Sequence, residues 1–577
     1  MNIKHALVSK DDSIREAVQI IDSAASRGGE PGIAVVVDED NKVLGVVTDG
    51  DIRDAFCRNL DFSKPVHSIM SMDYVYVYND ITPSQQLRLV LQRIDKVKKI
   101  KDPRLSKVIV CTKNKEFVDI VNLFELYRYG DVSLRRIAVY GMGFVGLTIA
   151  LTFAELQEFA IIGVDIDKEL IEKLKKGITP FYEKGLDFLL KYCHSNNSIQ
   201  FKHAGESVDA DIHIISVGTP IDEQQKPDYS FLESSGNYIG KILKEGDLVI
   251  CRSTVPAGTT RHLLIPLLEK ASGLTPGKDF FISFAPERTL EGNALKELKS
   301  LPQIVGGYSR TCTELTAKLF QKITPSIIQV NSLEAAEIIK LVNNTYRDTV
   351  FSFANEVALM CDMYNLDAFE IIEAANKGYP RSLIPVPSPG VGGICLFKDP
   401  YLYSFHGNSD NSFEVKFGHV SRAINQKMPG YVFSQFKKFV DLYSLNPETT
   451  KVLIVGLAFK GHPETSDTRC SPSIDLSNFL KGNGYFVQGV DHVLSNDEIY
   501  QLGICPTSIE EGIKKSNAVF FMNNHPLNMK FDLYNCLMEC KKPFFLFDGW
   551  NLFNKIEIES IDGIIYGTMG YSSVNKS

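Results

Sequence analysis

The chain has 577 residues, 44% of them hydrophobic and 23% charged, and its 62 basic and 70 acidic side chains give a formal net charge of -8. This length corresponds to about three to five globular domains, which excludes a peptide, and the composition excludes a fibrous or disordered chain. Because no Lys/Arg block is present, nucleic acid is not expected as a partner.

Neither export nor membrane insertion is predicted. The N-terminus carries charges throughout and lacks the apolar core of a secretory signal. The uncharged run 137–154 is interrupted by glycines in a pattern typical of soluble proteins. The 11 cysteines show no paired metal-ligand spacing, so no metal site is expected. Together these features predict reduced thiols and a cytoplasmic location.

Residues 1–130 are predicted to form an α+β domain built from two similar halves. Short strands alternate with amphipathic helices, and a similar order of elements recurs after about 60 residues. Each half alone has too little core, so we expect the two halves to pack together.

The segment GVVTDGDIR (45–53) resembles the closing strand and helix start of CBS domains, which occur in pairs and bind adenine nucleotides. The resemblance covers residues 1–128. It implies that Thr48 and Asp51 hydrogen-bond the ribose hydroxyls of a nucleotide. In the second half, Asn122 and Glu125 replace Thr and Asp, so a degenerate pair serving only packing or oligomerisation is the alternative.

A βαβ unit begins after residue 131 and carries the pattern G-x-G-x-x-G in the segment GMGFVG, residues 141–146. Gly141 permits a tight turn, Gly143 lets the backbone approach a pyrophosphate, and Gly146 lets helix and strand pack closely. Phe144 and Val145 complete this predicted cofactor loop.

Asp165 closes the second strand of the βαβ unit, where a carboxylate accepts hydrogen bonds from an adenosine ribose. It would repel a ribose phosphate, so NAD is favoured over NADP. Two later strands end in turns containing Thr219 and Thr254, which are therefore candidate cofactor neighbours.

Helical patterns follow over about 333–376 and 413–442, and a second βαβ pattern begins at 451. The predicted fold class is therefore α/β, with a Rossmann-type domain over 131–330, a helical domain over 331–446 and a second Rossmann-like domain over 447–577.

Cys395 directly follows a glycine-rich turn, and Asp399 lies four residues further on. If a helix begins there, the two side chains share one face. Backbone N–H dipoles at the helix N-terminus are expected to bias the thiol toward thiolate, as a nucleophile requires.

Two further pairs have the same four-residue spacing: Glu287 with Glu291, and Lys340 with Asn344. Such residues usually lie on a solvated face. Lys340, however, stands among apolar residues, where an ammonium needs an anionic partner or substrate.

From about residue 135 to 553 the chain resembles the nucleotide-sugar 6-dehydrogenases. The matching motifs occur in family order: GMGFVG, VGTP, STVPAGT, APERTLEG, AEIIKLVNNTYR with FANE, PSPGVGGICLFKD, and GLAFKG with DTRCSP. This family oxidises the C6 alcohol of a nucleotide sugar to a carboxylate with two NAD. The resemblance implies a dimerisation role for the helical domain and UDP-sugar binding by the C-terminal domain.

The resemblance also implies roles for the residues of the first oxidation. Asp399, with Lys340 and a water, would help remove the alcohol proton. Cys395 would trap the aldehyde as a thiohemiacetal, and a second hydride transfer would convert it to a thioester.

Water oriented by Glu287 and Glu291 would hydrolyse the thioester. Lys340 and Asn344 would stabilise the oxyanions, and Thr254 would help position the substrate-bound or attacking water.

Substrate-binding residues are implied in the same way. Lys460 matches a position near the sugar nucleotide, Gly392 belongs to the loop before the thiol, and Arg469 reaches toward NAD. Arg381 resembles an arginine that a neighbouring subunit inserts into the sugar site, which implies a homodimer or higher oligomer. Ile394 replaces the His or other residue that often precedes the Cys in this family.

A UDP-N-acetylhexosamine is the expected substrate, because APER and the PRSLIPVPSPGVGG spacing look more like that branch of the family. Glu291, which is typical of the UDP-glucose enzymes, keeps UDP-glucose as an alternative.

The main alternative enzyme class is a two-electron dehydrogenase of the hydroxyacid type, but such an enzyme has no use for Cys395. A nucleotide-sensing protein on an inactive scaffold conflicts with the intact Cys395, Lys340 and Glu287. We expect the N-terminal domain to tune the dehydrogenase, and the product to serve surface polysaccharide synthesis.

Overall fold

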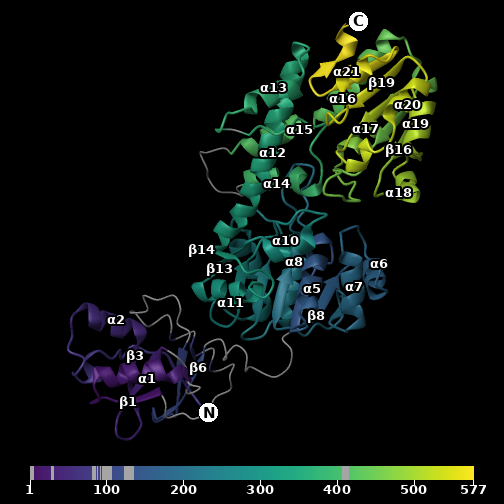
Figure 1. Cartoon of the computed structure of the whole chain (residues 1–577). Helices are drawn as coiled ribbons and strands as arrows, with labels where there is room; N and C mark the ends of the chain where they lie inside the picture. The colour runs from purple at the N-terminus through teal and green to yellow at the C-terminus, as the bar shows by residue number, and fades with distance from the viewer. Residues whose placement is uncertain are drawn as a thin grey trace. The chain divides into compact units, whose positions relative to one another are not determined.

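The chain forms two compact units, Met1–Leu134 and Arg135–Ser577 (Figure 1). The structure, a computed structural model, describes residues 6–26, 32–80, 86, 89–90, 93, 107–122, 136–381, 383–405 and 415–576. Within these residues, none of the helices is both long and apolar enough to span a bilayer.

The first unit contains two three-stranded sheets with the same topology. In each sheet the first pair of strands is parallel, the second pair is antiparallel, and the register shifts near the end of the middle strand. The elements are β1 (Leu7–Ser9), α1 (Ile14–Ser26), β2 (Ile33–Val37), β3 (Val43–Thr48), α2 (Asp49–Cys57), η2 (Val66–Ser68), β4 (Tyr76–Tyr78), β5 (Lys107–Cys111) and β6 (Phe117–Asn122).

The two halves exchange reciprocal hydrogen bonds at their equivalent turns. Val43 N donates to Lys115 O and Phe117 N donates to Asn41 O, both at 2.9 Å. Asn41 and Lys115 share a left-handed backbone, with φ of 63° and 65°. Ile109 of the second half also packs into one buried cluster with residues of the first. The predicted packing of two similar halves is confirmed.

The second unit begins with an eight-stranded sheet of order β14-β13-β12-β11-β10-β7-β8-β9, in which only the β12–β13 pair is antiparallel. From β9 to β12 this is the dinucleotide-binding strand order, with its switch point between β7 and β10. The elements are β7 (Arg136–Tyr140), α5 (Phe144–Glu155), β8 (Ala160–Asp165), α6 (Lys168–Lys175), α7 (Leu186–Ser195), β9 (Ile199–His203), β10 (Ile212–Ile215), α8 (Ser230–Ile242), β11 (Leu248–Cys251), η3 (Thr260–Leu264), α9 (Ile265–Ser272), β12 (Phe281–Phe284), α10 (Ala294–Ser300), β13 (Gln303–Gly307), α11 (Arg310–Phe320) and β14 (Ile327–Val330).

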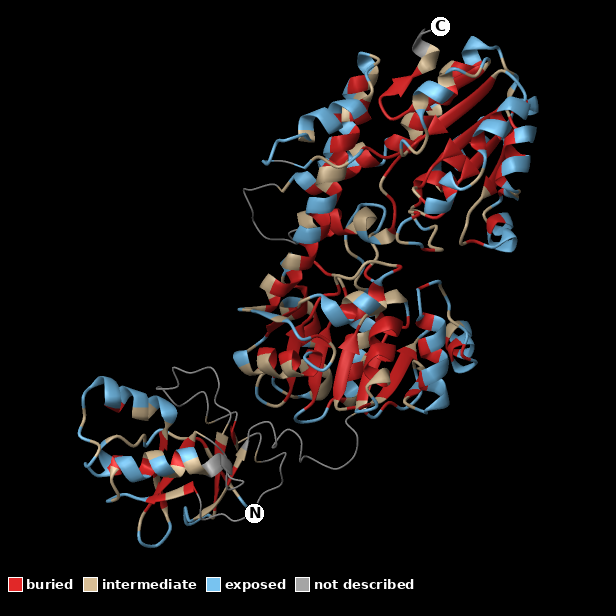
Figure 2. Cartoon of the chain, in the orientation of Figure 1, coloured by how far each residue is buried: buried red, intermediate tan, exposed pale blue. Residues whose placement is uncertain are grey.

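The central strands of this sheet are short apolar runs, as burial on both faces requires. Figure 2 shows the strands buried beneath partly exposed helices. The helical region that follows contains α12 (Leu333–Met363), α13 (Ala368–Asn376), α14 (Ile394–Ser404), α15 (Phe417–Asn425) and α16 (Met428–Leu442).

Helix α12 has 31 residues, and Ser332 caps its N-terminus by accepting from Ala335 N. Near its start, Leu333 and Ala336 are buried in the core beside the first sheet. Near its end, Ala358 and Cys361 are buried in the core of the C-terminal sheet. One helix therefore anchors both α/β domains.

The C-terminal sheet has the order β17-β16-β15-β18-β19-β20-β21 and is parallel except for β20–β21. Its elements are η4 (Pro447–Thr449), β15 (Lys451–Val455), α17 (Pro472–Gly482), β16 (Phe486–Val490), α18 (Asn496–Gln501), β17 (Cys505–Pro506), α19 (Ile509–Lys515), β18 (Ala518–Phe521), η5 (Pro526–Met529), α20 (Leu533–Glu539), β19 (Phe544–Asp548), α21 (Lys555–Glu559), β20 (Ile564–Thr568), β21 (Tyr571–Ser572) and η6 (Ser573–Lys576).

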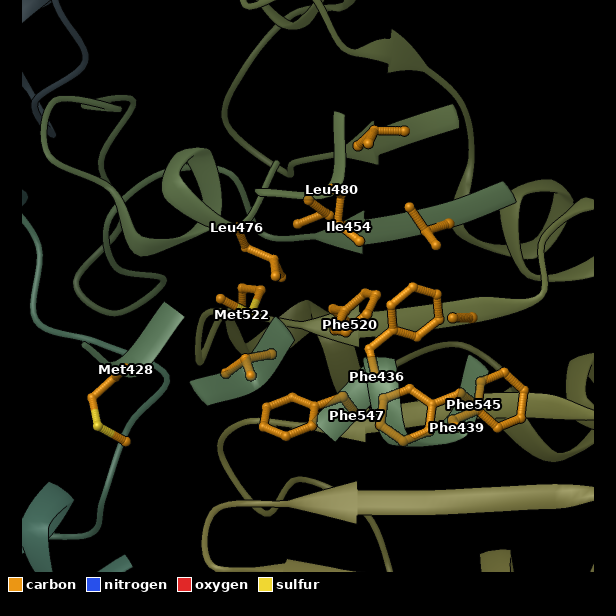
Figure 3. Packing of buried hydrophobic residues seen from close by; sticks show 14 of the residues in the cluster. Met428, Phe436, Phe439, Ile454, Leu476, Leu480, Phe520, Met522, Phe545 and Phe547 are labelled. Carbon is orange, nitrogen blue, oxygen red and sulfur yellow. The ribbon is translucent and has the colours of Figure 1, made fainter. Parts of the chain in front are cut away.

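Helix α16 packs into the core of the C-terminal sheet (Figure 3). The ring of Phe436 lies 5.5 Å from that of Phe520, and the ring of Phe439 lies 5.4 Å from that of Phe545, centroid to centroid. By its packing, α16 belongs with the C-terminal sheet, whereas the sequence pattern placed it in the helical region.

Candidate active site

The glycine loop after β7 leaves space for a dinucleotide. A Cβ on Gly146 would lie 1.7 Å from Gly141 O, so only glycine lets α5 pack this closely. A Cβ on Gly143 would meet nothing within 4 Å, and Gly143 caps α5 without a side-chain hydrogen bond. The open position and the free helix N-terminus fit the pyrophosphate of NAD.

The other predicted cofactor residues lie at the same edge of the sheet. Asp165 ends β8, and its Oδ2 accepts from Met142 N at 2.6 Å, beside the glycine loop. The Thr219 hydroxyl donates to Thr254 O, which joins the turns after β10 and β11. Phe144 and Val145 form the first turn of α5, and the Phe144 ring contacts that of Phe181.

Cys395 lies in the first turn of α14 and is exposed to solvent. The glycine turn before Cys395 packs closely against the C-terminal domain. A Cβ on Gly392 would lie 2.6 Å from Cys470 O, and one on Gly393, which has φ of +83°, would lie 2.8 Å from the Phe459 ring. The glycines therefore let the loop carrying the thiol approach the neighbouring domain closely.

Asp399 is buried one turn below Cys395. Its Oδ2 accepts from Asn344 Nδ2 at 2.6 Å and its Oδ1 from Lys398 Nζ at 3.0 Å. Lys340, one turn before Asn344 on α12, is buried. Within the described residues its ammonium makes no hydrogen bond or ion pair. Lys398 was not predicted as a partner of Asp399.

The expectation that Cys395 is biased toward thiolate is wrong for this arrangement. The surrounding protein desolvates the thiol and raises its pKa, and the carboxylate of Asp399 raises it further. Lys340 and Lys398 act in the opposite direction without reversing the shift. Activation of the thiol therefore depends on more than the helix N-terminus.

Glu287 is buried against Arg252, and the two side chains form an ion pair. The second oxygen of Glu287 accepts from the backbone N–H groups of Arg288 and Thr289, at 2.7 and 2.8 Å. Burial alone would raise the pKa of Glu287, but Arg252 and the Thr289 N–H overcome it and lower the pKa. Sequence reasoning missed Arg252, whose only signal is a charge directly after an apolar strand.

Glu291 lies where the C-terminal domain meets the NAD domain. Lys460 Nζ donates to Glu291 O at 2.6 Å, and Thr465 Oγ1 lies 3.4 Å from the carboxylate. Burial, followed by the charge of Asp467, raises the pKa of Glu291 to about 7, although Lys460 and Arg469 oppose the shift. A carboxylate with this pKa can exchange a proton near neutrality.

Two predicted arginines stand apart from this cluster of hydrogen bonds. Arg469 pairs with Asp467 through two nitrogens, with Nη2 at 2.7 Å from the carboxylate, and it influences Glu291 and Cys395 through its charge. Arg381 is exposed and lies over the Tyr379 ring. The described protomer does not bring Arg381 to the site, so its role in a neighbouring subunit stays a prediction.

In the N-terminal unit, Thr48 and Asp51 bond to each other. Thr48 caps α2, and both its hydroxyl and its N–H donate to Asp51 Oδ2, at 2.7 and 2.8 Å. Asn122 ends β6 as Thr48 ends β3. Glu125 lies outside the described residues.

The two Rossmann-like sheets, the helix bridging them and the cysteine between them define an NAD-dependent dehydrogenase with a second nucleotide-binding domain. The chain belongs to the UDP-glucose/GDP-mannose dehydrogenase family. Its residues 135–324, 334–427 and 453–555 match the NAD binding, central and UDP binding domains of that family, and residues 1–58 match a CBS domain.

Individual relatives agree with this assignment. The UDP-N-acetyl-D-mannosamine dehydrogenase of Pyrococcus horikoshii is 33% identical over 394 residues, covering 68% of this chain and 90% of that protein. The solved structure of the Pyrococcus horikoshii enzyme has a TM-score of 0.67 at 30% identity, over 75% of this chain and 99% of that one. The UDP-N-acetyl-mannosamine dehydrogenase of Staphylococcus aureus has a TM-score of 0.65 at 29% identity, over 75% and 98% of the two chains.

These findings confirm the predicted family, the fold class with its N-terminal CBS domain, NAD as cofactor and the oxidoreductase activity on a nucleotide sugar. Among the described residues, no group of three or more His, Cys, Asp or Glu side chains is placed to hold a metal ion.

Proposed function

We propose that the chain oxidises the C6 hydroxyl of a UDP-N-acetylhexosamine to the uronic acid in two steps, with Cys395 as the nucleophile. One observation carries the proposal: Cys395, an exposed residue, lies one helical turn from Asp399, which Asn344 holds, and the charge of the buried and unpaired Lys340 acts on its thiol. When bound, NAD accepts a hydride in each oxidation.

Asp399 and Lys340 serve the first oxidation in this proposal. Asp399 is held as an acceptor by Asn344 and Lys398, and it takes the alcohol proton through a water. The unpaired ammonium of Lys340 stabilises the oxyanion that develops, with Asn344 as the second donor.

Cys395 then adds to the aldehyde and carries the acyl group as a thioester. Glu291 activates the hydrolytic water, because its pKa of about 7 lets it take a proton at neutral pH. Glu287 has both oxygens occupied and fixes the loop that carries Glu291, while Thr254 orients the water from the NAD side.

The proposed substrate within this class is UDP-N-acetyl-D-mannosamine. The names of the relatives support it, together with the APER and PRSLIPVPSPGVGG segments. In this proposal Lys460 and Gly392 bind the sugar nucleotide, and Arg469 binds the cofactor. UDP-glucose is the competing substrate, since Glu291 is present.

The first test measures NADH formed per sugar consumed, and the mass of the product, over a panel of UDP- and GDP-sugars. We expect two NADH and one uronic acid from UDP-N-acetyl-D-mannosamine, and no complete turnover by Cys395→Ser. Cys505→Ser changes an exposed cysteine of β17 and serves as the matched control. One NADH with a carbonyl product, or full turnover by Cys395→Ser, would favour a two-electron dehydrogenase.

We also propose that the active protein is a homodimer joined through α12, with Arg381 completing the partner's site. An exposed apolar stripe runs along α12 to its C-cap at spacings of four and seven residues: Ile338, Val342, Tyr346, Phe353, Met360 and Tyr364. Light scattering of Tyr346→Glu tests this, because a charge on a stripe that the dimer would bury should yield monomers with reduced turnover. A dimeric Tyr346→Glu variant would contradict the interface.

We propose that residues 1–130 sense an adenine nucleotide. In the same division of the chain, residues 131–330 bind NAD, residues 331–446 form the helical dimerisation domain, and residues 447–577 bind the UDP-sugar. Thr48 and Asp51 would exchange their mutual bonds for ribose hydroxyls. Calorimetric titration with AMP, ADP and ATP should show binding to the wild type, little to Asp51→Asn, and wild-type binding by Asp54→Asn on the same helix. Binding by none of them favours a packing module.

The free thiols and the need for NAD and UDP-sugars support a cytoplasmic location. A uronic acid linked to UDP suits surface polysaccharide synthesis, the proposed use of the product.

A further inference from the structure

The segment that carries Cys395 has no regular secondary structure before α14. Residues 385–393 form a loop in which Gly390 and Gly393 adopt positive φ of 141° and 83°. Such a loop makes no helix or sheet ladder of its own, so contacts from outside must fix the position of the thiol.

On one side, the C-terminal domain confines this loop. A Cβ on Gly390 would lie 2.9 Å from Pro472, and Gly392 and Gly393 meet Cys470 and Phe459 as described above. These close steric contacts limit how far the loop can move toward the C-terminal domain, but steric contacts do not fix its orientation as hydrogen bonds do.

On the other side, a fully buried polar network fills the space between α12 and α15. Asp348 of α12 accepts from Arg422 Nη1 at 2.7 Å, from Asn425 Nδ2 at 2.8 Å and from Ser421 Oγ at 2.6 Å. Arg422 and Asp348 are 1% and 0% exposed. Replacing a buried ion pair by apolar residues is often neutral or stabilising, so stability alone does not explain why Arg422 and Asp348 lie here.

Arg422 contacts the chain on both sides of the thiol, in the loop before it and in the first turn of α14 after it. Its Nη1 and Nη2 lie 3.4 and 3.5 Å from Val391 O, four residues before Cys395. Its guanidinium lies over the ring of Phe397, two residues after Cys395, with Cζ 5.4 Å from the centroid. One rigid, planar group therefore brackets the nucleophile.

A second branch of the network reaches the start of the loop. Asn355 Nδ2 donates to Asn425 Oδ1 at 2.9 Å, and Asn355 Oδ1 accepts from Ser388 N at 2.8 Å. Ser388 in turn donates its hydroxyl to Gly390 O. All three side chains are buried, so these bonds are not exchanged with water.

We propose that Arg422, oriented by Asp348, is a positioning residue that sets the place of the Cys395 sulfur relative to the substrate. The proposal rests on the nucleophilic role given to Cys395 above. In this proposal Arg422 acts on the sulfur through Val391 and Phe397 and not by binding the substrate or the cofactor.

The step that depends on this placement is capture of the aldehyde. The sulfur bonds to the carbonyl carbon, the C=O π bond breaks, and the thiol proton passes to the carbonyl oxygen. No electrons are gained or lost in this addition, so its rate depends on geometry and protonation. A displacement of about 1 Å costs about 100-fold in such a step, so we expect uncaptured aldehyde to leave the enzyme.

The test compares Arg422→Met and Arg422→Lys with Arg261→Met in the full-length protein. Arg261 forms an ion pair with Glu334 near the start of α12, away from the loop, and serves as the matched control. The readouts are kcat and KM, NADH per sugar consumed, aldehyde trapped by a hydroxylamine reagent, and the rate of Cys395 alkylation by iodoacetamide across pH. Arg422→Lys keeps the positive charge beside Asp348 but lacks the planar guanidinium. It therefore provides a second test if Arg422→Met does not fold.

We expect a fall in kcat of about 100-fold with KM for NAD unchanged, trapped aldehyde, fewer than two NADH per sugar, and an altered alkylation profile. Arg261→Met should change none of these. A folded Arg422 variant that releases no aldehyde and alkylates like the wild type overturns the proposal. If the wild type itself yields one NADH per sugar, the proposed function fails, and the alkylation profiles alone then decide whether Arg422 positions the thiol.

Discussion

At the scale of single residues, Arg252 and Glu287 show what a sequence pattern cannot reveal. Glu287 was singled out by its spacing from Glu291, whereas Arg252 lies at the end of a different strand and meets it only in the folded protein. The pair makes Glu287 a fixed anion and leaves Glu291 as the carboxylate that titrates near neutrality.

The Arg252–Glu287 pair yields a stability prediction. Arg252→Met leaves the buried carboxylate of Glu287 without its counter-ion, and loss of one partner of a buried pair costs about 3–5 kcal/mol. Urea denaturation should show a drop of this size in the free energy of unfolding. Adding Glu287→Gln should recover part of it, and a double variant less stable than Arg252→Met would contradict this account.

Glu291 yields a prediction about pH. As a general base it must be ionised, so thioester hydrolysis should accelerate as pH rises through about 7, the value to which burial and Asp467 raise its pKa. Its folded-state pKa exceeds the usual 4.5, so its contribution to stability is present below 4.5 and is lost as pH rises through 7.

Stopped-flow NADH traces of the wild type and Glu291→Gln across pH test this expectation. The variant should give a burst followed by slow turnover, with the thioester on Cys395 visible by mass. A variant with the wild-type pH profile would assign the base to another group.

At the scale of elements, the strand–loop–helix unit around the glycines was predictable because each feature is local. An apolar run, three glycines at fixed spacing and a closing Asp165 act through their immediate neighbours. The environment of α16 was not predictable. Its amphipathic pattern indicates a buried face, but only the folded chain shows that Phe436 and Phe439 meet the C-terminal sheet.

The same reasoning applies to the site. The four-residue spacing correctly placed Lys340 beside Asn344 on one helix. It could not show that Asp399 takes its hydrogen bonds from Asn344 and Lys398, because that depends on how α12 and α14 cross. The raised pKa of Cys395 likewise depends on the folded surroundings of the thiol, which desolvate it and place Asp399 nearby.

The glycine loop allows a matched pair of variants. Gly146→Ala should lower both the unfolding temperature and NAD affinity, because its Cβ would lie 1.7 Å from Gly141 O. Gly143→Ala has open space and should weaken NAD binding with little effect on the unfolding temperature. Thermal melts and NAD titration by protein fluorescence separate the two effects, and equal melting temperatures would contradict the packing argument.

At the scale of the whole molecule, the chain divides into two compact units, Met1–Leu134 and Arg135–Ser577. Among the residues that the structure describes, the second unit has buried clusters made of its own residues. A chain beginning at Arg135 should therefore fold and keep its basal turnover in the absence of any added nucleotide. Circular dichroism and kcat measurements check this, and an unfolded or inactive truncated chain would show that the N-terminal unit is needed for the catalytic fold.

The long helix α12 has a consequence for how this chain can change. Leu333 is buried in one α/β core and Ala358 in the other, so the geometry of α12 fixes how the two domains are oriented relative to each other. Each residue of an α-helix advances about 1.5 Å and rotates about 100°. A single residue inserted between those two points would swing one domain around the axis and carry Lys340 or Asn344 away from Cys395. Between these two points α12 should therefore tolerate substitutions, but not insertions or deletions.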